Sequence, residues 1–279
     1  MKKWKTSSEL KAMAKEQLLG NYGVAAGAFA IFYGIIFAVI MLVYMAVITT
    51  VIAGTLAPGT AAMTDEAMLL TNGFTSPWYY VAIYAVSAVL SALMGTLVVG
   101  FSNVCLKIAR GQKPRIADLF YCYSHHPDKV IIIYLIIYAV SLILLLPSEI
   151  TSYFAVGNGG YTGMSFLLWS ILYIIGMVLS VIFSMMVSQV GFLYLDDPQT
   201  PSIDFFKQSI ALMKGNKGRL FYVTLSLIGW YLLVLVSCGI AAFWVMPYQN
   251  VILADFYRDL KGEFEEPQSR TESEVDYRI

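Results

Sequence analysis

Five long segments of the chain contain no Lys, Arg, Asp or Glu, and most of their residues are apolar. A membrane-spanning α-helix needs about 20 consecutive apolar residues, with a range of roughly 17–25. The five segments meet this requirement, at about residues 24–55, 79–105, 130–147, 165–194 and 220–237. A sixth candidate, about 240–258, is interrupted by Pro247 and contains Asp255. The pattern predicts an all-α, polytopic transmembrane helical bundle.

The composition agrees with burial in a membrane. Of the 279 residues, 58% are hydrophobic and 13% are charged, whereas soluble domains carry roughly 25% charged residues. So few polar side chains could not cover a water-soluble protein of this size. The basic residues flank apolar segments and form no basic domain, so nucleic acid is not expected as a partner. The first apolar run exceeds the roughly 7–15 residues of a cleaved secretion signal and predicts a retained helix.

The basic residues are confined to alternate connections between the apolar segments. All 18 Lys and Arg residues lie in 1–23, 106–129, 195–219 or the C-terminal tail, and the connections at about 56–78 and 148–164 contain none. Cytoplasmic loops of membrane proteins are enriched in Lys and Arg. Six spans place every basic residue on one side, whereas five spans would put the tail on the other side. We therefore expect about six spans in the cell membrane, with both termini cytoplasmic.

Short amphipathic helices are predicted before some of these spans. Thr6 and Glu9 fit a capping box, in which each side chain satisfies a free backbone N–H group at a helix start. Gly20-Asn21 then supplies a stop signal. A similar helix after Pro201 ends at Gly215-Asn216. Such helices can lie in the membrane interface with their lysines near anionic headgroups, or they can pack on the end of the bundle.

These recurring features suggest an internal repeat. We expect a single integral membrane domain over residues 1–260, divided into three units at about 1–105, 106–195 and 196–260. Each unit would consist of an interfacial helix and a transmembrane hairpin. Residues 261–279 form a charged cytoplasmic tail that we expect to be disordered.

Four amide side chains stand out within the apolar segments that return toward the cytoplasm. They are Asn103, Gln189, Gln249 and Asn250. An amide in lipid must find hydrogen-bond partners, so such residues usually face the interior of a bundle. They are therefore a candidate buried polar cluster. One interpretation is a pocket for a headgroup or solute, and the other is hydrogen bonding between helices that only fixes their packing.

The sequence favours no catalytic, cofactor or metal site. His125 and His126 are the only histidines and have only Cys122 and Asp128 near them, whereas zinc sites need three or four suitably spaced ligands. Asp196-Asp197 is more typical of a cap than of an acid–base pair. Phosphate-binding glycine loops, HExxH and GxSxG are all missing. The odd number of cysteines and their lack of CxxC spacing argue against a disulfide framework.

Several short motifs along the chain resemble those of a known family. They are Ser8-Glu9-Leu10-Lys11, Ala14-Lys15, Gly20-Asn21, Met213-Lys214-Gly215, Leu220-Phe221, Ser226-Leu227-Ile228-Gly229-Trp230, Gly239-Ile240, Pro247-Tyr248 and Phe256-Tyr257. With them the chain resembles the integral membrane family called domain of unknown function 975. The resemblance implies a polytopic bacterial membrane protein. It supplies no activity and no catalytic residues.

Three functional hypotheses follow from these observations. The first is a non-enzymatic membrane protein that binds membrane lipids, or a protein partner at the cytoplasmic face. The second is a transporter or permeability factor for a small or amphipathic solute, which would use the amide-bearing helices. The third is a lipid-processing enzyme. The apolar segments lack deep ionisable residues, which argues against ion-coupled transport, so the sequence favours the first hypothesis and leaves the oligomeric state open.

Overall fold

The computed structural model describes residues 4–56, 77–157 and 160–264, and all of its regular elements are helices. Most of the predicted tail, residues 265–279, and most of the 56–78 connection lie outside this described part. In chain order the elements are α1 (Ser7–Leu18), α2 (Tyr22–Leu56), α4 (Pro77–Ala109), the 3-10 helix η1 (Ile116–Phe120), α5 (Tyr121–Ser124), α6 (Pro127–Gly157), α7 (Gly163–Val187), α8 (Val190–Asp196), α9 (Ser202–Met213), α10 (Lys217–Leu225), α11 (Ile228–Val236) and α12 (Ala242–Lys261).

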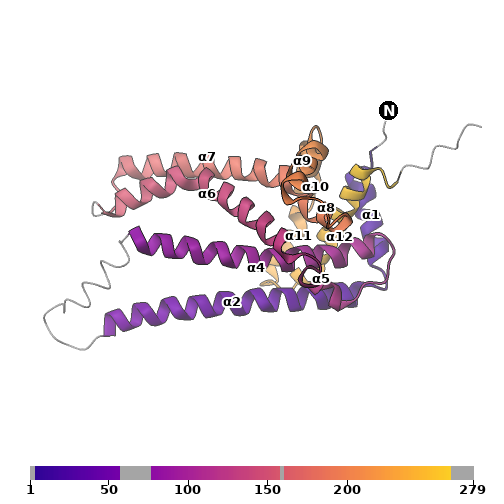
Figure 1. Cartoon of the computed structure of the whole chain (residues 1–279), viewed down its shortest axis with the longest axis horizontal. Coiled ribbons are helices and arrows are strands. Elements are labelled where there is room, and N and C mark those ends of the chain that lie inside the picture. Colours follow the sequence, from indigo (N-terminus) through magenta and orange to yellow (C-terminus); the bar gives the residue numbers. More distant parts are fainter. Residues whose placement is uncertain (1–3, 57–76, 158–159, 265–279) are drawn as a thin grey trace, which may run out of the picture.

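The long helices α2, α4, α6 and α7 form the body of the molecule (Figure 1). Helix α4 packs against α2 and α6, and α6 packs against α7. Close approach depends on glycine at two places, because a Cβ on Gly95 would lie 2.2 Å from the Tyr134 ring and one on Gly100 would lie 1.7 Å from the Leu119 carbonyl oxygen. Most apolar side chains of α7 nevertheless face outward, as expected for a helix surrounded by lipid.

The short helices gather at one end of these rods, which we call the short-helix end (Figure 1). The core of buried side chains lies there and includes Leu10, Tyr194, Phe205 and Tyr257. Helix α1 begins with the predicted capping box, in which the Thr6 side chain accepts from the Glu9 N–H and the Glu9 carboxylate accepts from the Thr6 N–H. The capping box thereby fixes the residue at which α1 begins, and α1 then packs on α12.

Five helices in the described part of the chain are long and apolar enough to cross a membrane: Tyr22–Met45, Val81–Ala109, Pro127–Ala155, Gly163–Asp196 and Lys217–Val236. This confirms an all-α, polytopic protein. The sixth expected segment corresponds to α12, which is not among the five. Its second half is buried in the core and includes Asp255 and Asp259, because it packs on protein rather than on lipid.

Several segments differ from the sequence-based boundaries, for example the expected span at 165–194, which is divided into α7 and α8. Helix α6 continues through Pro147 to Gly157, past the expected end at residue 147. The expected span at 220–237 is divided into α10 and α11 by a turn at Ser226-Leu227. A short helical element precedes each of α2, α6 and α10 in the chain. The division into three units stays a prediction.

Candidate functional site

The four predicted amides lie at different places and bond to different elements. Asn103 is 7% exposed and its amide donates to the Asp118 carbonyl oxygen of η1 over 3.2 Å. Gln189 is 1% exposed, and its backbone N–H donates to the Ser209 hydroxyl of α9 over 3.3 Å. Both therefore link an end of a long helix to a short helix.

The other two amides belong to α12 and are half-buried. The Asn250 side chain donates to the Met246 carbonyl oxygen of its own helix over 2.9 Å. The Oε1 atoms of Gln189 and Gln249 are buried without a hydrogen-bond partner among the described residues. No hydrogen bond joins two of the four amides in the described part of the chain. The structure thus does not bring them together, and a ligand-binding role for them stays a prediction.

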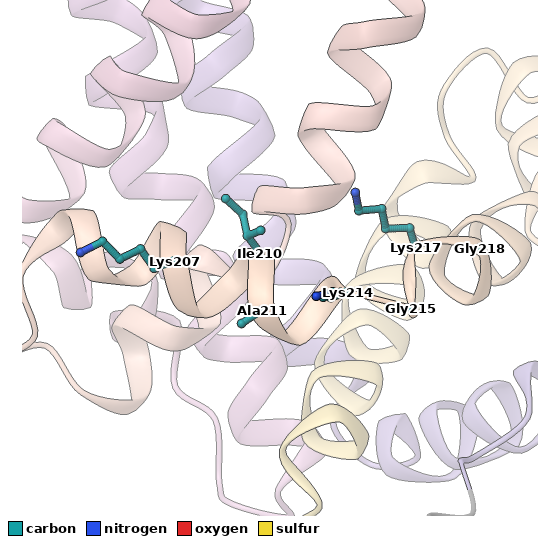
Figure 2. Close-up of a pocket in the computed structure, with 7 residues that line it drawn as sticks. All are labelled: Lys207, Ile210, Ala211, Lys214, Gly215, Lys217 and Gly218. Atoms are coloured by element: carbon teal, nitrogen blue, oxygen red, sulfur yellow. The ribbon is translucent and has the colours of Figure 1, made fainter.

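A basic pocket of about 640 Å³ lies instead between α9 and α10 (Figure 2). Its lining residues are Lys207, Ile210, Ala211, Lys214, Gly215, Lys217 and Gly218. The chain reverses here through Gly215, whose φ of +82° is accessible to glycine at little cost. This turn brings the end of α9 and the first turn of α10 to the same opening. Lys207, Lys214 and Lys217 therefore line one pocket.

The positive charge of the basic pocket is only partly neutralised. Lys207 pairs with Asp204 over 2.9 Å. Lys214 and Lys217 form no ion pair with any residue that the structure describes. The three ammonium groups point in different directions from the backbone (Figure 2). The pocket is therefore an open, electropositive surface, suited to several anionic groups at once.

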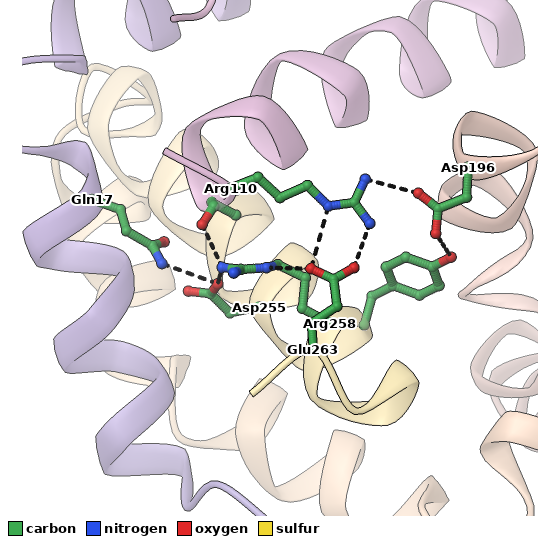
Figure 3. Close-up of polar contacts among 8 residues, drawn as sticks. Gln17, Arg110, Asp196, Asp255, Arg258 and Glu263 are labelled. Atoms are coloured by element: carbon green, nitrogen blue, oxygen red, sulfur yellow. Dashed lines mark hydrogen bonds and ion pairs between the residues drawn. The ribbon is translucent and has the colours of Figure 1, made fainter. Parts of the chain in front are cut away.

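A network of charged groups ties α12 to α4 and α8 at the same end of the molecule (Figure 3). Arg110 pairs with Asp196 over 2.8 Å and also with Glu263. Arg258 pairs with Glu263 and with Asp255, each over 2.9 Å. The network holds the helix ends together. Asp255 is its most buried carboxylate: Oδ2 has no hydrogen-bond partner among the described residues, and burial raises the pKa of the Asp255 carboxyl to about 6.

The network also sets the ionisation of two of its members. Burial disfavours the charged form of the Glu263 carboxyl, but hydrogen bonds from Arg110 and Arg258 outweigh this, so the pKa of Glu263 is lowered. Burial likewise acts against the Arg110 cation, but Glu263 and Asp196 stabilise it and its pKa is raised. Both residues are therefore charged at neutral pH.

A second ion pair positions α10. Arg219 pairs with Asp259 of α12 and donates to the Lys5 carbonyl oxygen over 2.7 Å. Its guanidinium lies 4.8 Å from the centre of the Phe256 ring and 5.2 Å from that of Trp4, within the range of cation–π attraction. Helix α10 is thus fixed against α12 and the segment before α1.

Both histidine rings contact neighbouring side chains. The His125 ring stacks on Tyr121 at 4.1 Å between ring centres, and His126 Nε2 lies 3.2 Å from the Gln199 amide. In the residues that the structure describes, no three His, Cys, Asp or Glu side chains are grouped so that they could hold a metal ion. Asp197 caps a turn by accepting from the Thr200 hydroxyl.

The chain matches a described protein family. The family described as "Protein of unknown function (DUF975)" matches residues 1–263. The chain belongs to the DUF975 family. No curated protein and no solved structure matches the chain. Membership confirms the resemblance found in the short motifs, and the five apolar helices identify this DUF975 protein as a membrane protein.

Sequence reasoning missed the basic pocket. The charge pattern groups its lysines with the other basic residues of the cytoplasmic connections, whereas their distances from one another depend on the turn between α9 and α10. The signal that could have revealed the pocket is the Lys-Gly-Asn-Lys run at 214–217, because a turn flanked by two lysines brings both to one opening.

Proposed function

We propose that this DUF975 protein is a non-enzymatic protein of the cell membrane that binds anionic lipid headgroups at its cytoplasmic side. The observation that carries the proposal is the basic pocket, which has three lysines and no acidic residue in its lining. Basic clusters beside the cytoplasmic ends of membrane helices attract the anionic lipids of that leaflet. The placement of all 18 basic residues on one side of the apolar segments supports this orientation.

The position of α9 supports binding at the membrane surface. The helix lies crosswise to the long helix above it (Figure 2). Phe205, Ser209 and Met213 are buried on its inner side, whereas Ile203 and Ile210 are exposed. Lys207 and Lys214 lie near these isoleucines at helical spacing. An amphipathic helix with this arrangement can rest in the headgroup layer, with isoleucines toward the acyl chains and lysines at the phosphates.

The transport hypothesis has less support. It requires the amide-bearing helices to form a shared polar path. Asn103 and Gln189 instead bond to the short helices at one end, and Asn250 bonds within its own helix. The basic pocket contains none of the four amides in its lining and opens at the surface. An open pocket of this kind suits the retention of a lipid headgroup.

The test compares lipids retained by the purified protein. The double variant Lys214→Gln/Lys217→Gln removes the two unpaired lysines, and Lys113→Gln/Arg115→Gln removes two exposed charges from another loop at the same end. Each protein is equilibrated in mixed phosphatidylglycerol and phosphatidylcholine, and retained lipid is measured by native mass spectrometry. Each lysine near an anionic surface contributes about 1 kcal/mol, so affinity for phosphatidylglycerol should fall by up to roughly 30-fold in the pocket variant.

Retention of phosphatidylcholine should not change, and the control variant should keep most of its phosphatidylglycerol. Equal losses in the two variants would mean that only the total charge matters. Unchanged retention in the pocket variant would overturn the proposal.

A further inference from the structure

The depth of the α11–α12 hairpin in the membrane can be read from its contacts with α2. Phe243, next to the hairpin turn, lies 5.7 Å from Phe29 and 6.4 Å from Tyr33 between ring centres. These two residues belong to the first third of α2, which continues to Leu56. Phe29 also contacts Phe101 of α4 at 5.7 Å, near the short-helix end of that helix. The hairpin turn therefore reaches only part of the way along the long helices.

The base of the hairpin lies at the level of α1. Arg219 donates to the Lys5 carbonyl oxygen, and the Ser226 carbonyl oxygen accepts from the Lys11 ammonium over 2.9 Å. Both ends of α10 thus lie beside α1. Helix α10 also packs against α7, at the short-helix end (Figure 1). On the returning helix of the hairpin, α12, the Tyr248 hydroxyl donates to the Lys11 carbonyl oxygen over 3.2 Å. Of the segment Lys217–Val236, which leads to the hairpin turn, α10 lies at the level of α1 and α11 extends beyond it.

Helix α11 is too short to cross a bilayer. It has nine residues, which extend about 13 Å at about 1.5 Å per residue. The hydrocarbon core of a bilayer is about 30 Å thick. The 20-residue length of Lys217–Val236 includes α10, whose contacts hold it at the level of α1.

The hairpin turn is built for an apolar environment. Its flanking side chains are strongly exposed and apolar, with Leu235 at 75%, Val236 at 81% and Ile240 at 64%. Every backbone N–H from Ser237 to Val245 donates within the hairpin, that of Ala241 to the Ser237 hydroxyl over 2.9 Å. A turn in water has no need for this, whereas a turn in lipid does, because an unpaired N–H there costs several kcal/mol.

We infer that α11 and α12 form a re-entrant hairpin that enters one leaflet from the short-helix end and returns without crossing the membrane. Its partner is the acyl-chain layer of that single leaflet, which covers the exposed face of α11. The chain then crosses the bilayer four times, through α2, α4, α6 and α7. Both termini still lie on the same side, as with six spans. The inference uses none of the lysines of the basic pocket.

Cys238 offers a direct test because it lies in the hairpin turn and is exposed, while Cys105 and Cys122 are buried. If two spans cross the membrane, this thiol faces water outside the cell. In a re-entrant hairpin it faces lipid and is shielded from a membrane-impermeant maleimide on both sides. The wild-type protein is compared with Cys238→Ser in intact and in permeabilised cells, so that the difference reports Cys238 alone.

Two controls in the Cys238→Ser background report the two aqueous sides. Tyr161→Cys lies in the connection between α6 and α7, and Lys113→Cys in the loop after α4; both positions are exposed. Each should be labelled from its own side, and Cys238 should react at least tenfold more slowly than either, becoming reactive only in denaturing detergent. Labelling of Cys238 at the Tyr161→Cys rate would restore the full crossing.

Labelling of Cys238 at the Lys113→Cys rate would place the turn outside the bilayer and would also overturn the inference. If the two controls exchange sides while Cys238 stays protected, the hairpin stands and the cytoplasmic orientation in the proposed function fails. The two proposals are therefore separable in one experiment.

Discussion

Helices α1 and α9 end in the same turn. The residues after them, Leu19 and Lys214, have nearly equal backbone angles, with φ/ψ of −60°/121° and −64°/118°. Gly20 and Gly215 follow at φ values of +85° and +82°. In each turn the next residue is Asn, whose side chain donates to a carbonyl oxygen four residues earlier, over 3.2 Å and 3.0 Å. The Gly-Asn similarity in the sequence therefore encodes the same local structure twice.

The helices that follow the two turns are very different. Helix α2 continues for 35 residues without a charge in its first turn. Helix α10 begins with Lys217 and Arg219, stops after nine residues and is held by the Arg219–Asp259 pair. A basic residue at a membrane boundary favours the headgroup region. An apolar first turn, in contrast, can enter the hydrocarbon layer directly. The turn thus fixes a change of direction, and the next residues determine how soon the chain enters lipid.

This difference limits what charge placement can say about topology. Lys and Arg residues report the side on which a connection lies. A hairpin that crosses twice and a hairpin that re-enters both return the chain to the starting side. The tail charges are therefore equally compatible with six spans and with four spans plus a re-entrant hairpin. Depth has to come from packing contacts such as those of Phe243.

The largest expected effect comes from releasing α10. Replacing Arg219 with Met leaves the Asp259 carboxylate, whose side chain is 5% exposed, without its cation. Removing one partner of a buried ion pair costs roughly 3–5 kcal/mol. The free energy of unfolding, measured by denaturant titration in detergent, should fall by about that amount, whereas Lys113→Met in an exposed loop should change it by less than about 0.5 kcal/mol.

A second variant identifies the cause of that loss. Adding Asp259→Leu to Arg219→Met removes the stranded carboxylate and should recover part of the stability. If Arg219→Met is as stable as Lys113→Met, then α10 is not held by this pair, and the contrast between α2 and α10 must have another origin.

The next effect tests whether the two turns are equivalent. Gly20→Ala and Gly215→Ala each place a Cβ at positive φ, which costs roughly 1–2 kcal/mol. An added Cβ would have no neighbour within 4 Å at either position, so the two losses in unfolding free energy should be equal. Gly23→Ala and Gly218→Ala are matched controls, one in each following helix, with equally open space. Because Ala favours a helix more than Gly by about 1 kcal/mol, these controls should be neutral or stabilising.

Much of the fold followed from local patterns in the sequence. The long uncharged segments predicted α2, α4, α6 and α7, and the Thr6–Glu9 pair predicted the start of α1, because hydropathy and capping are properties of neighbouring residues. The break at Ser226-Leu227 was not predicted. The segment 220–237 contains no charged residue. The break between its halves depends on contacts of α10 with distant parts of the chain, among them Lys5, Asp259 and helix α7.

The candidate site was harder to predict for the same reason. Asn103 and Gln189 are buried. Their hydrogen-bond partners lie on η1 and α9, elements that no pattern in their own helices identifies. The basic pocket needs the α9–α10 turn, and the Arg110–Glu263 pair joins residues far apart in the chain. Such contacts depend on tertiary structure.

The smallest expected effect concerns pH and the end of α12. The pKa of Glu263 is lower in the folded protein than in the unfolded chain. Its stabilising contribution is therefore complete above the ordinary Glu value of about 4.3 and is lost as pH falls through the folded pKa. Hydrogen exchange of residues 258–263, corrected for the intrinsic pH dependence, should accelerate as pH falls below about 4.3. Protonation of Asp255, whose pKa is raised to about 6 by burial, is complete before this range is reached.

The turn between α1 and α2 provides the internal comparison. The hydrogen bonds of Gly20-Asn21 involve backbone groups and one amide, none of which titrates, so corrected exchange at residues 19–23 should not respond over the same pH range. Glu263→Gln should remove the acid response of α12 while keeping a neutral group of similar size. Equal acceleration at both places would indicate global unfolding. It would also show that the charged attachment of α12 to α4 does not set its local stability.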